Sequence, residues 1–346
     1  MTPPAVADDG ALGLDVDLAF GHHLLALADD VEAEEVEALA VSWFEDAGWA
    51  GPHALALTAE AVLTGPWLVD GVVRRALRLP AECVQVFLLR CPVLRSGPVG
   101  PELTRYDPIL AAFADGVPYG IEDEALRFLV AAARRLAGAV RVAGSGAVVT
   151  PDPESDVNLT LFSPVWLEPD ALVAVLAPAL PGVRLAMDLG DFTPSTASPP
   201  TDAPGAEELD EGEQEWLHAE AAAYDEAALA DPPVQEGYGA VVELGQDGAI
   251  EVAVTGEEHL PVVLTALDWA DDGVIAYAVR WWPPDEEALA RPEVPLEVRQ
   301  SRLRAREKVE AAALALYRAA GGEIADDSGF LVEPESLVPG PDDDEA

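Results

Sequence analysis

The histidines are the residues best suited to hold a metal ion, and their spacing does not favour a metal site. They are His22, His23, His53, His218 and His259. Only His22 and His23 are close in sequence, and adjacent side chains point in different directions on a helix or a strand. A divalent-metal site completed by the nearby aspartates is the alternative to a simple surface pair. We predict no metal ligands.

The two cysteines, Cys83 and Cys91, both fall in one strand-like run. Eight steps of about 3.3 Å put them roughly 26 Å apart, which is beyond disulfide reach. Arg90 adjoins Cys91 and could lower the pKa of its thiol, which would suit a reactive cysteine. We expect buried structural thiols instead, and no redox pair.

The glycine-rich stretch Gly144-Ser145-Gly146 follows a strand-like run and leads into another. A dinucleotide site needs a third glycine and a following helix, whose N-terminus receives the pyrophosphate. A nucleophile elbow needs a further upstream glycine around Ser145. We therefore interpret the stretch as a hairpin turn. No Walker sequence occurs, so we predict no cofactor-binding residues and no cofactor.

Carboxylates are too numerous to single out a catalytic pair. With 64 Asp and Glu in the chain, sequence cannot select two that meet in a cleft with separated pKa values. Asp268, beside Trp269, is the best candidate for a partly buried acid. The run Asp326-Asp327-Ser328-Gly329 indicates a turn and lacks the ligand spacing of a calcium loop. We name no catalytic residue and lean against an enzyme.

Two features could bind a partner. The predicted helix 295–320 carries most of the basic residues of the C-terminal region, at Arg299, Arg302, Arg304, Arg306, Lys308 and Arg318. This basic face either pairs with the protein's own acids or binds an acidic partner. In the second feature, the pair Trp281-Trp282 ends a strand, and alternation should bury one indole and turn the other outward.

The net charge of -45 is concentrated in blocks. Residues 1–73 contain 14 acids and residues 185–279 contain 22, with no Lys or Arg in either. Such a charge repels nucleic acid, so we expect no nucleic-acid partner. An acidic DNA mimic, which would inhibit a DNA-binding protein, is an alternative that the charge suggests.

The apolar pattern predicts alternating helices and strands. One helix is expected after a cap at Asp29 or Asp30. Two others are expected over 121–138 and over 295–320. Strands are expected at 53–60, 83–90, 139–143, 147–150, 157–162, 183–188, 238–244, 249–255, 262–267, 273–281 and 323–332. A pattern of strand, Trp-Leu helix and strand recurs about 100 residues apart, with the helices opening at Trp67-Leu68 and at Trp166-Leu167. Coincidence is the alternative to a duplication.

These patterns predict an α+β fold of two α/β-sandwich modules with mixed, mostly antiparallel sheets of ferredoxin-like βαβ type. The modules are expected at 1–190 and 236–338. Between them, residues 191–235 contain a Pro, Ser and Thr-rich linker, predicted to be disordered, and an acidic helix at about 206–230. Residues 339–346 form an acidic tail that we also expect to be disordered.

Half of the residues are apolar, so the chain can bury substantial cores despite its charge. No run of about 18 apolar residues occurs, and the first residues lack the features of a signal peptide. We expect a cytoplasmic protein with no membrane partner. The dominance of Arg over Lys, with abundant Ala and Gly, is typical of a GC-rich, actinobacterial-like genome.

The sequence thus favours a non-catalytic, protein-binding or regulatory protein whose partner it does not identify. The alternatives are an enzyme of unrecognised type that uses Asp or Glu, with or without a divalent metal, and the DNA mimic described above.

Overall fold

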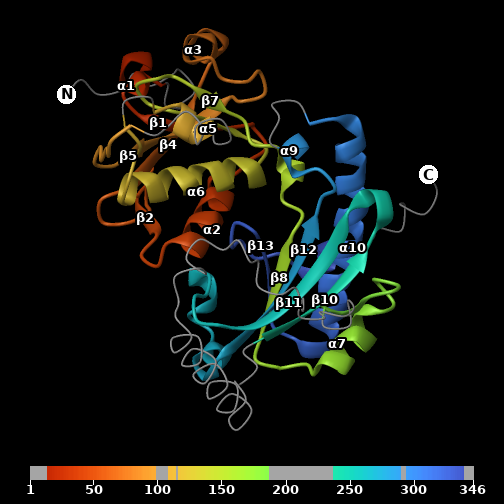
Figure 1. Ribbon diagram of the computed structural model, residues 1–346. Helices are drawn as coiled ribbons and strands as arrows, with labels where there is room; N and C mark the ends of the chain where they lie inside the picture. Colours follow the sequence, from red (N-terminus) through yellow and green to blue (C-terminus); the bar gives the residue numbers. More distant parts are fainter. Residues whose placement is uncertain (1–13, 99–107, 114–115, 187–236, 290–293, 339–346) are drawn as a thin grey trace, which may run out of the picture.

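Two antiparallel β-sheets dominate the fold (Figure 1). The computed structural model describes residues 14–98, 108–113, 116–186, 237–289 and 294–338. Within these residues no helix has both the length and the apolar character that crossing a bilayer requires. The expected linker, acidic helix and acidic tail lie outside the described residues.

The first sheet has the strand order β2-β3-β4-β5-β1-β6-β7. Its strands are β1 (His23–Leu27), β2 (Gly48–Gly51), β3 (Ala54–Ala56), β4 (Val62–Leu68), β5 (Gln85–Arg90), β6 (Ala139–Arg141) and β7 (Val148–Val149). Helices α2 (Ala33–Trp43) and α6 (Ile121–Arg135), with the short α5 (Pro108–Ala111), bury one face. Helices α1 (Val16–Phe20) and α3 (Gly71–Leu77) bury the other. The first sheet is therefore the middle of three layers.

The second sheet has the order β13-β8-β12-β11-β10-β9. Its strands are β8 (Leu159–Ser163), β9 (Arg184–Leu185), β10 (Gly237–Glu243), β11 (Ala249–Glu257), β12 (Val274–Trp282) and β13 (Glu323–Asp326). Helices α7 (Pro169–Leu176) and α10 (Leu296–Ala320), with α9 (Glu286–Leu289), lie over one face. The 3-10 turns η4 (Val262–Leu264) and η5 (Asp268–Asp272) cover part of the other.

Both sheets have the same strand order. Numbered from its own first strand, each sheet reads 2-3-4-5-1-6, with β8 in the place of β1 and β13 in the place of β6. The helices correspond as well, because α2 and α7 follow the first strand and α6 and α10 precede the sixth. Even the hairpin from β6 to β7 has a counterpart in the bridge between Ala325 and Leu331. One topology therefore occurs twice.

The correspondence extends to single residues in the helix that follows the first strand of each sheet. In α2 and the residue after it, Val36, Ala40 and Phe44 are buried. In the α7 segment the buried positions are Leu172, Leu176 and Leu180, each 136 positions further along the chain. All three residues of each set belong to the apolar cluster that packs on their own sheet.

A second correspondence occurs where α6 and α10 lead into the sheets. Ala137 and Gly321 both have positive φ, and each is followed by a glycine. A Cβ on Gly138 would lie 2.5 Å from the Ala26 carbonyl oxygen, and one on Gly322 would lie 2.0 Å from that of Phe162. Ala26 and Phe162 occupy the same register position on β1 and β8. Both sheets therefore need glycine at this close approach.

The structure corrects the expected organisation. Strands β8 and β9 belong to the second sheet, so the change from one sheet to the other falls between Val149 and Leu159, whereas we placed residues 1–190 in one module. Every strand pair among the described residues is antiparallel, so the sheets are not mixed. The predicted α+β class is confirmed.

Three local predictions were wrong. Trp67 and Leu68 end strand β4, and α3 begins only after its cap Asp70. The proposed Trp-Leu repeat therefore matches the end of a strand at Trp67-Leu68 with a loop at Trp166-Leu167. The predicted strand at 262–267 is a 3-10 turn. Glu32, not Asp29 or Asp30, caps α2, with Glu35 accepting the Glu32 N–H at 2.8 Å. The helix predicted at 121–138 is confirmed as α6, and that at 295–320 as α10.

Candidate functional site

One row of cross-strand neighbours shows how the two sheets differ. In the first sheet the row reads Thr64, Leu88, Leu24, Arg141 across β4, β5, β1 and β6. In the second sheet the same row reads Ala253, Ala278, Thr160, Ala325 across β11, β12, β8 and β13. Large side chains that pack beneath α1 and α3 in the first sheet are thus replaced by small ones in the second.

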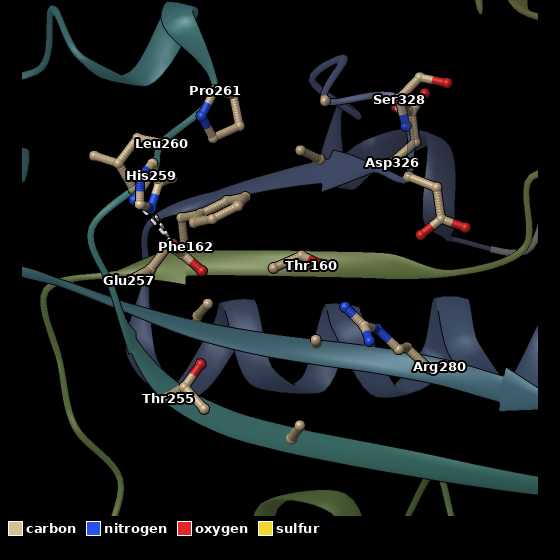
Figure 2. A pocket seen from close by; sticks show the side chains of 16 residues that line it. Thr160, Phe162, Thr255, Glu257, His259, Leu260, Pro261, Arg280, Asp326 and Ser328 are labelled. Atoms are coloured by element: carbon tan, nitrogen blue, oxygen red, sulfur yellow. Dashed lines mark hydrogen bonds and ion pairs between the residues drawn. The ribbon is translucent and has the colours of Figure 1, made fainter. Parts of the chain in front are cut away.

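The small side chains form the floor of a cavity of about 560 Å³ on this face of the second sheet. We call this the open-face cavity. Figure 2 shows its two ends: Glu257, His259 and Pro261 lie at one, and Arg280, Asp326 and Ser328 lie at the other. Hydroxyl groups of Thr160, Thr255 and Ser328 also line it. The cavity therefore offers hydrogen-bonding groups and charges of both signs along its length.

Arg280 is the strong base of this cavity. It is exposed, projects from β12 and makes no ion pair or hydrogen bond among the contacts found for the described residues. Its cross-strand neighbour Glu251 instead accepts a hydrogen bond from Trp282 Nε1 at 2.9 Å. A guanidinium presents its donors in a planar fork that matches carboxylate or phosphate oxygens. Arg280 is thus available to an anionic group.

The acids of the cavity are held by contacts of their own. Asp326 Oδ1 accepts the backbone N–H groups of Ser328 and Phe330, both at 2.9 Å. Asp327 Oδ2 accepts from Asn158 Nδ2 at 2.9 Å. Glu257 accepts the His259 N–H at 2.9 Å. These bonds fix three carboxylates in place, and each carboxylate has lone pairs left for a cationic or hydrogen-bonding ligand.

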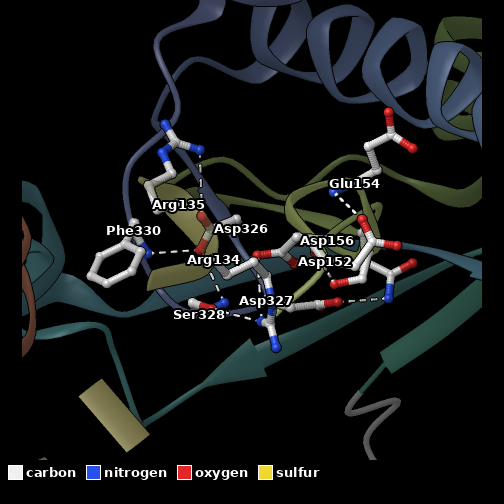
Figure 3. Close-up of polar contacts among 11 residues, drawn as sticks. Arg134, Arg135, Asp152, Glu154, Asp156, Asp326, Asp327, Ser328 and Phe330 are labelled. Atoms are coloured by element: carbon white, nitrogen blue, oxygen red, sulfur yellow. Dashed lines mark hydrogen bonds and ion pairs between the residues drawn. The ribbon is translucent and has the colours of Figure 1, made fainter. Parts of the chain in front are cut away.

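Asp326 also lines a second cavity of about 320 Å³, toward the first sheet. Arg135 of α6 lies 3.6 Å from Asp326 Oδ2, and Arg134 lies 4.0 Å from Asp156 Oδ2 (Figure 3). Arg134 also donates to Ser328 Oγ at 3.4 Å. We call this charged group the inter-sheet cluster, because it joins α6 of the first sheet to the turn after β13 of the second.

Burial raises the pKa of two acids in this cluster. Asp326 has a pKa of about 6, raised by desolvation and by the nearby charge of Asp156. Asp156 also has a raised pKa, mainly from burial and then from the charge of Asp327. Asp156 Oδ1 and Arg134 Nε are buried and have no hydrogen-bond partner. Paired acids in a cavity with raised pKa values are a pattern seen at active sites and in structural networks alike.

A separate buried cluster surrounds Glu122 in the first sheet. Its carboxylate pairs with Arg95, accepts the Leu94 N–H at 2.7 Å, and lies 3.0 Å from His23 Nε2. His23 Nδ1 accepts the Ala143 N–H at 3.0 Å, so the proton of the neutral ring is on Nε2 and points to Glu122. Burial lowers the pKa of His23 to about 4. Both ring nitrogens are occupied, so this histidine is structural.

The structure does not bring the candidate site residues named from the sequence together in one site. His22 bonds the Leu89 carbonyl oxygen while its neighbour His23 bonds Glu122, so the pair shares no ligand position. Cys83 is buried and Cys91 half-buried, both free, and burial raises the pKa of each thiol. Ser145 Oγ accepts the Ala147 N–H at 3.3 Å within the turn between β6 and β7. Within the described residues, no three metal-ligating side chains converge.

The remaining candidates also have clear positions. Asp268 is exposed, so the structure does not support it as the candidate for a partly buried acid. Trp281 is buried and Trp282 is exposed, as strand alternation predicts. The basic helix α10 pairs largely with the protein's own acids: Arg302 with Asp152 and Glu154, and Arg304 with Asp247. Arg299 remains exposed and unpaired among the described contacts.

Sequence reasoning missed the open-face cavity and its base Arg280. The one signal in the sequence was on β11, where Glu251, Ala253 and Thr255 alternate with apolar residues. This alternation indicates that one face of the strand has no large apolar cover. Comparisons with protein-family models, with curated proteins and with solved structures gave no match to this chain.

Proposed function

We propose that this chain is a non-catalytic binding protein that holds a segment of a protein partner in the open-face cavity. The observation that supports this is Arg280, a cation beside a cavity that has no ion-pair partner among the described residues, in a chain of net charge -45. A base without such a partner can bind a carboxylate from outside, and charged groups of this kind set orientation and specificity.

The chemistry of the cavity suggests the kind of segment. Arg280 suits a carboxylate side chain, whereas Asp327 and Glu257 suit a basic one. Arg280 and Glu257 lie at opposite ends of the cavity (Figure 2), which suits an extended segment with an acidic and a basic residue near each other. The small floor residues leave room for its backbone and side chains. A zwitterionic small molecule would use the same groups and is an alternative outcome of the test.

The experiment is selection from a random peptide library displayed on phage against the immobilised full-length chain. We expect enrichment of sequences that combine Asp or Glu with Lys or Arg. The matched control is the double variant Thr160→Leu, Ala278→Leu, which places on the floor the leucines that the first sheet carries at Leu24 and Leu88. Enrichment of the same sequences on this variant, or no enrichment on the native chain, would count against the proposal.

A second candidate is acid–base catalysis in the inter-sheet cluster. Two observations favour it: the pKa of Asp326 is about 6, in the range of a proton donor, and Asp156 Oδ1 lacks a partner. The test is turnover of model glycosides and esters between about pH 5 and pH 7, compared with Asp156→Asn. No turnover by the native chain, or equal turnover by the variant, would remove this candidate.

We further propose that the repeated topology marks two modules of a ferredoxin-like type, each extended by an added hairpin. In support, α6 and α10 each connect parallel strands that flank a third, β1 or β8, as in a split βαβ unit. Separate expression of residues 150–338 tests this, and a chain that fails to fold cooperatively would contradict an independent second module.

A further inference from the structure

Arg141 is a buried cation to which the described residues supply no counter-ion. The residue is 4% exposed and lies on the face of the first sheet that α1 and α3 cover. Its Nε and Nη1 atoms are buried without any hydrogen-bond partner, and it makes no ion pair among the contacts of the described residues. Burying an unpaired charge is strongly unfavourable, so such a group calls for an explanation.

The aromatic contact of this guanidinium does not supply the missing charge. Its carbon lies 5.0 Å from the centre of the Phe20 ring, at the end of α1. A cation–π contact is worth much less than a counter-ion to a desolvated cation. The corresponding position in the second sheet is the neutral Ala325, so the topology itself does not demand a charge here.

A second arginine increases the positive charge at this place. Arg78, the residue after α3, lowers the pKa of Arg141 through its charge, in addition to the effect of burial. Arg78 is exposed and unpaired among the described contacts. By contrast, eight arginines elsewhere among the described residues pair with acids: Arg95, Arg127, Arg134, Arg135, Arg184, Arg302, Arg304 and Arg306. Arg78 and Arg141 thus bring two positive charges to one place where no described carboxylate pairs with them.

The turn between β6 and β7 lies close beside Arg141. The turn Gly144-Ser145-Gly146 passes so close that a Cβ on Gly146 would lie 3.1 Å from Arg141 Nη2. This turn and the Phe20 ring therefore both lie against the guanidinium. Two guanidinium charges match a doubly charged oxyanion, and the planar forks match its oxygens.

We infer that Arg141 and Arg78 form a binding site for a phosphate group between α1, α3 and the turn that joins β6 to β7. The phosphate neutralises the buried guanidinium and accepts hydrogen bonds from its unpaired N–H groups. The three elements lie together at one end of the molecule, away from the second sheet (Figure 1). The site is independent of the open-face cavity, and its ligand is either free phosphate or the phosphate of a monoester.

The test is the thermal unfolding of the full-length chain in inorganic phosphate, phenyl phosphate or chloride at matched ionic strength. Phosphate at a few millimolar should raise the unfolding temperature of the native chain in a saturable manner, since a ligand that binds only the folded state stabilises it. Arg141→Met should abolish this shift, and Arg78→Gln should weaken the phosphate affinity about tenfold. Arg280→Met, on the other sheet, should retain the full shift.

The phenyl phosphate arm distinguishes the sources. Stabilisation by both compounds supports a site for phosphate monoesters, and stabilisation by inorganic phosphate alone supports a site for the free ion. An unfolding temperature that follows ionic strength only, or an Arg141→Met variant with the native phosphate shift, would overturn the inference. Should Arg141→Met not fold, Arg78→Gln decides, because unchanged phosphate affinity in that variant would also overturn it.

Discussion

Phe330, just after the last strand of the second sheet, packs against Trp43 of α2 beneath the first sheet, with ring centroids 5.6 Å apart. Phe330 is almost fully buried and belongs to the same apolar cluster as Phe44 and Phe128. The second sheet thus contributes an aromatic side chain to the core of the first. The corresponding position near β7 is Ala147, which packs at the edge of that same core.

This contact predicts a large effect of Phe330→Ala. Removing a buried phenyl ring leaves a cavity among aromatic residues, so we expect a loss of about 3–5 kcal/mol in the free energy of unfolding. Urea denaturation followed by tryptophan fluorescence measures it. Tyr119→Ala, which removes a half-exposed ring, is the control and should lose less than about 1 kcal/mol. Equal losses in the two variants would refute the coupling role of Phe330.

The raised pKa of Asp326 predicts a pH-dependent effect of Asp326→Asn. A carboxyl whose folded pKa of about 6 exceeds its unfolded value makes the folded state less stable once it ionises. The asparagine can still accept the turn N–H groups but carries no buried charge. At about pH 7.5 the variant should therefore be more stable than the native chain by about 1–3 kcal/mol, and the difference should shrink as the pH falls through about 6 toward 4.

Chemical denaturation at several pH values measures that difference. Asp327→Asn changes the adjacent, exposed residue of the same turn and serves as the control. A difference between Asp326→Asn and the native chain that stays constant with pH, or that grows on acidification, would show that Asp326 does not ionise as described.

His23 predicts the opposite pH dependence. Its folded pKa of about 4 lies below the unfolded value, so the stability that it contributes is present above about pH 6.5 and is lost as the pH falls toward 4. His23→Leu, which introduces the residue found at the equivalent Leu159, leaves the Ala143 N–H and one Glu122 oxygen without their partner. We expect a loss of about 2–4 kcal/mol near pH 7 that becomes smaller near pH 4.5. A loss that is equal at both pH values would contradict this role.

The paired glycines before β6 and β13 predict steric strain on substitution. A Cβ at Gly138 would meet the Ala26 carbonyl oxygen and the Leu27 side chain at 2.5 and 2.7 Å. Gly138→Ala should therefore cost about 2–4 kcal/mol, because backbone must move to admit the methyl group. Gly48→Ala, where nothing lies within 4 Å, is the control and should be near neutral. Thermal unfolding distinguishes them, and two near-neutral variants would show that the close approach is not needed.

Local patterns were sufficient to predict some elements and not others. Helix α6 was predictable because acids in its first turn, arginines in its last and an apolar stripe agree. Strand β1 was missed because both its faces are buried, which removes the alternation that signals a strand. Strand β4 contains Gly65-Pro66, which indicates a break, so Trp67 and Leu68 were assigned to the following helix.

The repeated topology and the two arginine sites could not be predicted from sequence for a related reason. The two halves share buried positions rather than identical residues, as Val36 and Leu172 show. Which arginine lacks a partner depends on contacts between distant residues: Arg302 pairs with Asp152, which lies 150 positions away, while Arg280 faces a cavity. Net charge alone carries no information on such pairing.

The most direct test of the proposed function is the affinity of one library-selected peptide for three forms of the full-length chain, measured by calorimetric titration. Reversing the charge in the cavity with Arg280→Glu should weaken binding at least about thirtyfold, because a charge-assisted pair becomes a repulsion. Reversing another exposed arginine outside it with Arg299→Glu should change the affinity less than about twofold. Similar affinities for the native chain and Arg280→Glu would contradict binding of a partner segment at the open-face cavity.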